Sequence, residues 1–423
     1  MSDTFEVSDT QNAGVVPPLL RRNANFRRYF VGQGVSLIGD QVTLIALPLT
    51  AVLALHAGPG QMGALTTVAL VPNLLFSLHA GAWVDRLGKR RLVMLVADAA
   101  RGLVLAVVPI TYALGDLSWP VLYGVAFATG TLAVVFYVAF GGFFQTIVER
   151  DDYVAANSLI HGSRGFSFLA GNSLGGALVQ LLRGPYALVL DAVSFLWSAF
   201  FLGRIDAPDP PPATSEEGGV LAGARWLRGN AVMRADLLGV ATINLFNFMF
   251  FALFLLYATR SLHVRPAALG IVLAIGSIGT VAASALTGPI AGRLGVGPTF
   301  ILGCFLFPAP LVLVPAAGGP HWLVLLLLGL AELGSGTGVM LLDIMAGSMA
   351  AALIPPPLRS RVSGAFMVVN YGVRPIGTTL AGILGSTIGL RPTLWIATIG
   401  SVAGVAWLLP SPVRTMRELP EAA

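Results

Sequence analysis

The feature that most constrains this chain is a series of apolar stretches, each about as long as a membrane crossing. A helix needs about 20 mainly apolar residues to cross about 30 Å of hydrocarbon. In lipid, an open sheet would leave backbone groups unpaired, so each stretch is predicted to be a helix. The sequence predicts an all-α membrane protein with twelve transmembrane helices at 29–55, 62–83, 92–112, 119–143, 157–182, 186–204, 237–260, 267–291, 299–317, 321–353, 362–386 and 392–410.

Composition excludes a soluble protein, because 56% of the 423 residues are hydrophobic and only 11% are charged. Soluble chains carry about 25% charged residues. The net charge of +5 does not indicate nucleic-acid binding, since most cations flank the apolar stretches. The only cysteine, Cys304, excludes an internal disulfide or a cysteine metal cluster. We therefore expect a lipid bilayer as partner, no nucleic acid, no cofactor and no metal.

The loop cations predict the orientation of the chain. If the N-terminus is cytoplasmic, eighteen Lys and Arg residues lie on the cytoplasmic side, whereas Arg183, Arg260, Arg265 and Arg391 are the four outside. This bias follows the positive-inside rule and places both termini in the cytoplasm. We expect a multi-pass monomer in the plasma membrane of a bacterial cell.

An internal repeat divides the chain into two halves of six helices. An offset of 207 residues takes Gly81 to Gly288, Gly88 to Gly295 and Pro185 to Pro392. Such an offset is typical of duplicated bundles. The expected parts are a cytoplasmic tail 1–28, a first bundle 29–204, a cytoplasmic linker 205–236, a second bundle 237–410 and a C-terminal tail 411–423; a short surface helix is expected at 222–230.

Ionisable residues inside the spans are functional candidates, because they are costly in lipid. The five acids are Asp40, Asp98, Asp191, Glu332 and Asp343, and the three bases are Arg101, Arg164 and Arg374. Two carboxylates are thus left without an obvious cation. Since desolvation disfavours the charged form, an unpaired carboxylate in a span is suited to exchange a proton. The count predicts proton coupling.

Asp40 is our first candidate for the proton site. It lies in the middle of the first span, and Gln33 is seven residues earlier on the same helical face. A structural hydrogen bond to a neighbouring helix is an equal alternative for Asp40. Asp98 and Arg101 are one turn apart and are predicted to neutralise each other, which is a structural role.

The tenth span carries Glu332 and Asp343, which are eleven residues apart and therefore share a helical face. Both remain proton-site candidates. Arg374, in the eleventh span, is the expected partner for one of them. A pair that exchanges partners would suit a conformational switch, and a fixed ion pair is the alternative.

The connection between the second and third spans has the spacing G-x-x-x-D-R-x-G-[KR]-[KR]. Its residues are Gly81, Asp85, Arg86, Gly88, Lys89, Arg90 and Arg91. The pattern resembles the signature loop of the major facilitator superfamily. Further stretches, such as Gly39-Asp40 and 184–196, resemble the enterobactin-exporter and macrolide-efflux branch. The fifth span contains Gly171, Gly175 and Gly176, which predict close helix packing and are similar to an exporter motif, although Asn172 replaces its proline.

The resemblance implies that two rocking bundles alternate the access of a central cavity lined by spans one, four, seven and ten. Asp85 would then hold the signature loop against the second half in the outward-open state, assisted by Arg86, Lys89 and Arg90. The cavity candidates are Gln33, Tyr137, Phe140, Asn244, Asn247, Phe248 and Phe251. Packing against helices or lipid is the alternative for the aromatic residues.

These observations predict a proton antiporter that exports a small amphiphilic or hydrophobic compound. The first rival is a proton symporter that imports a metabolite, but the spans offer only Arg164 and Arg374 as cations for an organic anion. The second rival is a membrane-embedded enzyme. No H-E-x-x-H zinc motif, G-x-S-x-G elbow or ATP-binding loop is present in the sequence, which disfavours an enzyme.

Overall fold

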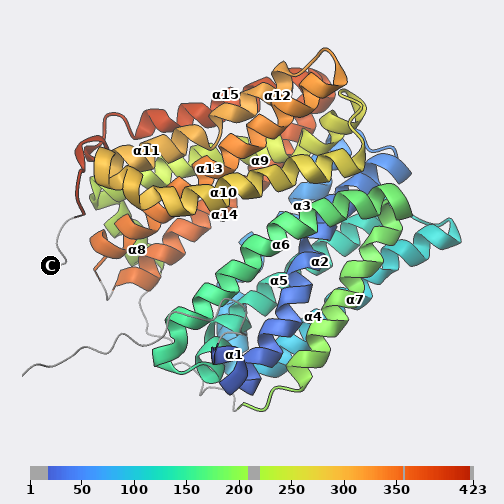
Figure 1. Ribbon diagram of the computed structural model, residues 1–423, viewed down its shortest axis with the longest axis horizontal. Helices are drawn as coiled ribbons and strands as arrows, with labels where there is room; N and C mark the ends of the chain where they lie inside the picture. Colours follow the sequence, from blue (N-terminus) through green and yellow to red (C-terminus); the bar gives the residue numbers. More distant parts are fainter. Residues whose placement is uncertain (1–17, 208–219, 356–357, 420–423) are drawn as a thin grey trace, which may run out of the picture.

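A computed structural model of the protein describes residues 18–207, 220–355 and 358–419, and the regular structure in these ranges is helical. The predicted tail before residue 18, the linker from 208 to 219, residues 356–357 and the last four residues lie outside the described ranges. Figure 1 shows two helical bundles, one from each half of the chain. The predicted all-α fold with two six-helix bundles is confirmed.

The first bundle consists of α1 (Pro18–Arg22), α2 (Ala24–Ala54), α3 (Pro59–Leu87), α4 (Arg90–Leu114), α5 (Trp119–Ile147), α6 (Tyr153–Leu182) and α7 (Gly184–Gly203). Helix α2 begins five residues before the predicted span. Asn23 caps it, because its side-chain oxygen accepts a hydrogen bond of 2.8 Å from the backbone N of Phe26. The cap satisfies a backbone donor that the first turn would otherwise leave unpaired.

The second half consists of α8 (Val220–Gly229), α9 (Ala231–Arg260), α10 (Pro266–Leu294), α11 (Val296–Leu306), α12 (Leu313–Ala316), α13 (His321–Leu353), α14 (Arg359–Thr387) and α15 (Leu390–Ala403). The short helix predicted in the linker is confirmed as α8, and Gly223 of α8 packs on Arg361 at the start of α14. The long tenth span, 321–353, is one helix as predicted. The ninth span is not, since Pro308 and Pro310 lack the N–H that a continuous helix needs.

The offset of 207 residues fits the helix bounds. Adding it to 59 and 87, the bounds of α3, gives 266 and 294, the bounds of α10. The cap of α2, Asn23, becomes Asn230, the cap of α9. Gly88 and Gly295, which end the matched helices α3 and α10, both have positive φ, at 60° and 96°. The two bundles are therefore pseudo-symmetric copies of one helical unit.

Nine helical segments in the described ranges are long and apolar enough to cross a bilayer. They are α2, α4, α5, α6, α7, α9, α10, the α11–α12 segment and α13. The offset matches each of the remaining long segments to one of these nine, since α3 corresponds to α10, α14 to α6 and α15 to α7. The repeat thus adds these three helices to the nine and gives the twelve predicted transmembrane helices.

The bundles join through α3 with α14 and through α6 with α10. Glycines permit both contacts, because a Cβ on Gly63 would lie 2.6 Å from Cα of Gly382, and one on Gly176 would lie 2.8 Å from Cα of Gly270. The hydroxyl oxygens of Thr67 and Thr378 are 2.7 Å apart across the first contact. These residues lie at the end of the molecule that holds the α2–α3 and α9–α10 connections, which we call the joined end.

The buried hydrophobic residues show that the bundles separate away from the joined end. One core cluster includes residues of both bundles, such as Met62 and Leu253. Toward the opposite end the clusters divide, with Phe26 and Phe143 in the first bundle and Phe300 and Met349 in the second. In Figure 1 the bundles meet at the upper right and diverge toward the lower left, where α1 and α8 lie.

Candidate functional site: a two-lobed chamber between the bundles

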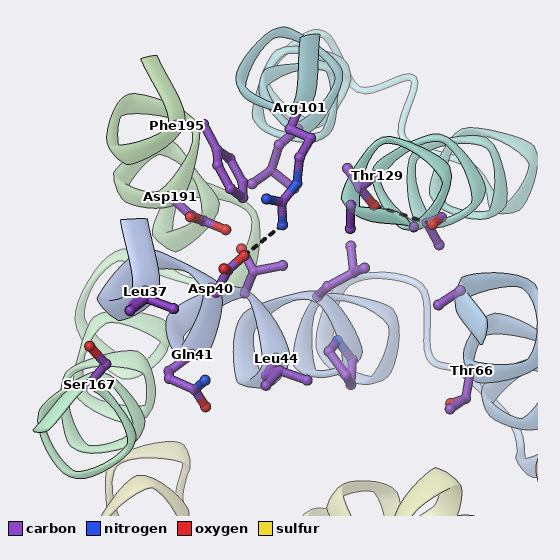
Figure 2. Close-up of a pocket in the computed structure, with 18 of the residues that line it drawn as sticks. Leu37, Asp40, Gln41, Leu44, Thr66, Arg101, Thr129, Ser167, Asp191 and Phe195 are labelled. Atoms are coloured by element: carbon purple, nitrogen blue, oxygen red, sulfur yellow. Dashed lines mark hydrogen bonds and ion pairs between the residues drawn. The ribbon is translucent and has the colours of Figure 1, made fainter. Parts of the chain in front are cut away.

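The first lobe of the chamber is a cavity of about 510 Å³ that is lined by the first bundle and by Phe251 of α9. Its wall is mainly apolar, and the polar or charged side chains on it come from helices α2 to α7. Those residues are Asp40, Gln41, Thr43, Thr66, Arg101, Thr129, Tyr137, Arg164, Ser167 and Asp191. Figure 2 shows Asp40, Arg101 and Asp191 converging on this lobe from three helices.

The second lobe is a cavity of about 480 Å³ that α2, α6, α9, α10 and α13 line. It contains Glu332 and Asp343, together with the hydroxyls of Ser277, Thr280 and Ser335. Both lobes share four wall residues, which are Gln41, Leu44, Phe168 and Phe251. The lobes are therefore the two halves of one chamber with a mainly apolar waist, and each bundle contributes its own carboxylates.

Asp40 has a cation, contrary to the assumption that led to its choice. Nη2 of Arg101 lies 2.7 Å from Oδ1 of Asp40, and Nη1 lies 3.6 Å from Oδ1 of Asp98. The guanidinium also stacks on Phe195, with its carbon 3.8 Å from the ring centre. The expected Asp98–Arg101 contact is present, but the shorter one joins α2 to α4. A count of charged residues along the sequence cannot identify the pairs that form between different helices.

Gln33 does not line the first lobe. Its amide nitrogen donates hydrogen bonds of 3.2 Å to Asp98 and 2.7 Å to Ser198, and the Ser198 hydroxyl donates to Asp98 at 2.5 Å. Gln33 instead belongs, with Tyr29, Tyr137, Phe140 and Arg164, to a small pocket of about 10 Å³ beside the lobe. Phe140 stacks on Tyr29 with ring centres 5.0 Å apart, and it is not part of either lobe wall.

Arg374 is not ion-paired with either acid of the tenth span, contrary to expectation. Its Nη2 donates a hydrogen bond of 3.0 Å to the side-chain oxygen of Asn370, one turn earlier on α14. The guanidinium carbon lies 4.7 Å from the ring centre of Phe248 and 4.4 Å from that of Tyr371. An amide and two ring faces thus hold this cation. Neither α13 acid has an ion pair or a side-chain hydrogen bond in the described ranges.

Three of the α9 candidates do not line the chamber. The side chain of Asn244 donates to the carbonyl oxygen of Val240 at 3.1 Å, which satisfies the amide within its own helix. Neither Asn247 nor Phe248 is part of a lobe wall, whereas Phe251 lines both lobes. The implied lining by spans one, four, seven and ten is incomplete, since α3, α4, α6, α7 and α10 also contribute wall residues.

The signature segment is mostly helical rather than a loop. Gly81, Asp85 and Arg86 belong to α3, and the connection consists of Gly88 and Lys89 alone. The side chain of Asp85 lies outside the described residues, and Arg86 is exposed. The Arg90 guanidinium packs over Gly142 of α5, where a Cβ would collide with it, and Arg91 donates to the carbonyl oxygen of Ile205. These described contacts stay within the first bundle.

The glycines of α6 lie at helix contacts. A Cβ on Gly171 would be 2.6 Å from Cβ of Gln41, and one on Gly175 would be 3.1 Å from Cα of Val42. Gly176 faces α10 at the bundle contact described above. One glycine face thus packs on α2, and the neighbouring face packs on the second bundle.

Asp236 is a buried acid that sequence reasoning missed. It is 2% exposed in α9, and its Oδ1 has no hydrogen-bond partner in the described structure. The seventh span was predicted to begin one residue later, so Asp236 was assigned to the linker. The signal that identifies it is Asn230, whose side chain caps α9 at Val232 and Met233 and moves the helix start to Ala231.

Comparisons with known proteins agree with this architecture. A sequence profile of the Major Facilitator Superfamily matches residues 29–239 and again residues 237–423. The multidrug efflux pump Tap of Mycolicibacterium fortuitum is 27% identical over 393 residues, which cover 84% of this chain and 88% of that protein. The uncharacterized MFS-type transporter YfiS of Bacillus subtilis is 25% identical over 395 residues, which cover 90% and 89%.

A solved structure shows the same fold. The crystal structure of a bacterial homologue of the iron transporter ferroportin, in an inward-facing state, has a TM-score of 0.71. It is 17% identical, and the superposition covers 92% of this chain and 98% of that one. Together with the profile, which matches each half of the chain, these findings establish that the protein is a membrane transporter and belongs to the major facilitator superfamily.

Proposed function

We propose that this protein exports small amphiphilic or hydrophobic compounds by proton antiport, through alternating access of the chamber to the two sides of the membrane. The observation that carries the proposal is the chamber itself, whose mainly apolar wall holds carboxylates from both bundles. An apolar wall with a few polar groups suits ligands that are themselves mainly apolar. The likeness to multidrug efflux pumps supports export.

From the positive-inside orientation we infer which state of the transport cycle this conformation represents. With both termini in the cytoplasm, the joined end faces outward, and the end at which the core clusters divide faces the cytoplasm. The conformation is then inward-open, ready to take a compound from the cytoplasm or the inner leaflet. The pseudo-symmetric contacts α3–α14 and α6–α10 would open in the outward state.

Protons would be coupled to transport through the chamber carboxylates Asp40, Glu332 and Asp343. A proton that arrives from outside neutralises one of them and favours return to the inward-open state, and a substrate then displaces it. Coupling arises because the two ligands prefer different conformations. Protonation of Asp40 would also release Arg101, which holds α2 and α4 together by a 2.7 Å contact.

An importer of sugars or organic anions is less well supported. Such substrates need a polar site, because their many hydrogen-bonding groups would otherwise be left unpaired. The chamber offers two cations on its wall, and Arg101 is already engaged by Asp40 and Asp98.

The test uses inverted membrane vesicles with an acidic interior and three fluorescent probes, which are ethidium, rhodamine B and the uncharged dye Nile red. We expect vesicles that contain the protein to accumulate at least one probe above the level of vesicles that lack it. Collapsing the pH gradient should abolish the difference. Accumulation that persists at full extent after the collapse would exclude proton antiport.

Single substitutions then assign the proton site. Asp40→Asn should abolish gradient-driven accumulation while the protein remains folded in the membrane. The control Glu149→Gln removes an exposed carboxylate outside the spans and should leave accumulation unchanged. If Asp40→Asn transports normally, the proton site lies elsewhere, and Glu332→Gln and Asp343→Asn are the next variants to measure.

A further inference from the structure

Arg164 of α6 is a cation on the chamber wall without a protein partner. It lines the first lobe and the small pocket beside it, and it is half-buried. In the described ranges its side chain makes no ion pair and no hydrogen bond. Asp40, which lines the same lobe, is already paired with Arg101. An unpaired guanidinium at membrane depth is costly, and an anionic ligand group would offset that cost.

Tyr137 is suited to bind an anion together with Arg164. Its phenol lines the same lobe and the same small pocket as Arg164. The hydroxyls of Ser163 and Ser167 already donate to backbone carbonyl oxygens one turn earlier on α6. A phenol donates readily to an oxyanion, and a guanidinium binds a carboxylate with two parallel hydrogen bonds. Arg164 and Tyr137 therefore provide the donors for an anionic group in the first lobe.

Glu332 of α13 is the complementary case in the second lobe. It makes no ion pair or side-chain hydrogen bond in the described part of the chain. The other acid on this wall, Asp343, is eleven residues further along α13, and Arg374 is held by Asn370 and two rings. The carboxylate packs closely on α10, since a Cβ on Gly276 would lie 3.3 Å from its Oε2. A ligand cation is the missing partner.

The two unpaired groups lie on opposite bundles and at different depths. Arg164 is eleven residues from Tyr153, where α6 starts at the divided end, and Glu332 is eleven residues from His321, where α13 starts at the joined end. Between them lies the apolar waist with Phe168 and Phe251. A complementary ligand thus carries an anionic group, an apolar body and a cationic group in that order from the divided end inward.

We propose that the chamber binds a zwitterionic amphiphile, with its anionic group on Arg164, its apolar body between Phe168 and Phe251, and its cationic group on Glu332. The assignment rests on the proposed export function and narrows its substrate class. It assigns the ligand's cationic group to Glu332 and not to Asp343, because Asp343 lies on the same wall but nearer the divided end.

The test is equilibrium binding of two dyes to the purified full-length protein in detergent, by fluorescence polarisation. Rhodamine B carries a carboxylate and a delocalised cation, whereas its ethyl ester carries the cation alone. We expect rhodamine B to bind about tenfold more tightly than the ester, because only the carboxylate can pair with Arg164. Equal or tighter binding by the ester, or binding of neither dye, overturns the assignment.

Two variants locate the contacts. Arg164→Gln should remove the preference for rhodamine B and leave binding of the ester unchanged, while Glu332→Gln should weaken both dyes by about tenfold. Arg225→Gln, an exposed position on α8, is the matched control and should change neither. A preference that survives Arg164→Gln also overturns the proposal. If the Arg164-dependent preference is present but no gradient-driven transport occurs, the ligand class stands and the antiport function fails.

Discussion

The two bundles share one helical plan but treat their membrane-embedded charges differently. In the first bundle, Arg101 contacts both Asp40 and Asp98, and Ser198 and Gln33 complete the network around Asp98. In the second bundle, Arg374 is held by an amide and two rings, and the acids of α13 have no ion pair in the described ranges. In the first bundle Asp40, Asp98 and Arg101 therefore form one charge network, whereas the α13 acids of the second bundle stay outside any ion pair in the described ranges.

This difference arose although the backbone repeat is close. The offset of 207 takes Asp98 to Phe305 and Arg101 to Pro308, so the second copy of the α4 network is lost. Pro308 also breaks the helix there, between α11 and α12. Duplicated halves thus retain their helix ends and glycine contacts while their polar interiors diverge.

The largest expected effect comes from breaking the first-bundle network. Arg101→Met removes the cation that compensates Asp40 and Asp98 and leaves two carboxylates in the protein interior. We expect the free energy of unfolding to fall by about 3–5 kcal/mol, the usual cost of leaving a buried charge unpaired. Thermal unfolding of the purified protein in detergent measures it. A loss as small as that of the control Arg225→Met would show that the network does not stabilise the bundle.

A smaller effect is expected from the matched change in the second bundle. Arg374→Met removes two cation–π contacts and one amide hydrogen-bond pair but strands no carboxylate in direct contact. We expect a loss of about 1 kcal/mol in the same unfolding assay. Destabilisation equal to that of Arg101→Met would contradict the contrast between the bundles and would mean that Arg374 compensates Asp343 through the chamber.

Helix number, helix order and the repeat could be predicted because hydrophobic length and glycine or proline spacing are local properties. The prediction of α13 at 321–353 and of the short helix α8 needed no tertiary information. Predicting which side chains pair between helices did need tertiary information. Gln33 and Asp40 share a face of α2, yet Gln33 bonds to Ser198 and Asp98, while Asp40 turns to Arg101.

The candidate site was predicted in part. Asp40, Tyr137, Phe251, Glu332 and Asp343 do line the chamber. Asn244 does not, because a helical asparagine can donate to its own backbone one turn earlier, which no periodicity reveals. A residue's position on the chamber wall does not establish what the residue does. The roles of these residues are proposals that the transport and binding experiments above test.

The central claim is that the two bundles rock about the chamber, so that one end closes as the other opens. Spin labels at Asn157→Cys and Leu294→Cys report on the divided end of α6 and α10, and labels at Leu182→Cys and Ser261→Cys report on the joined end, in a Cys304→Ala background. Pulsed electron resonance at acidic and alkaline pH, with and without rhodamine B, gives both distances. We predict that one distance shortens as the other lengthens. Distances that change together, or not at all, would contradict the account.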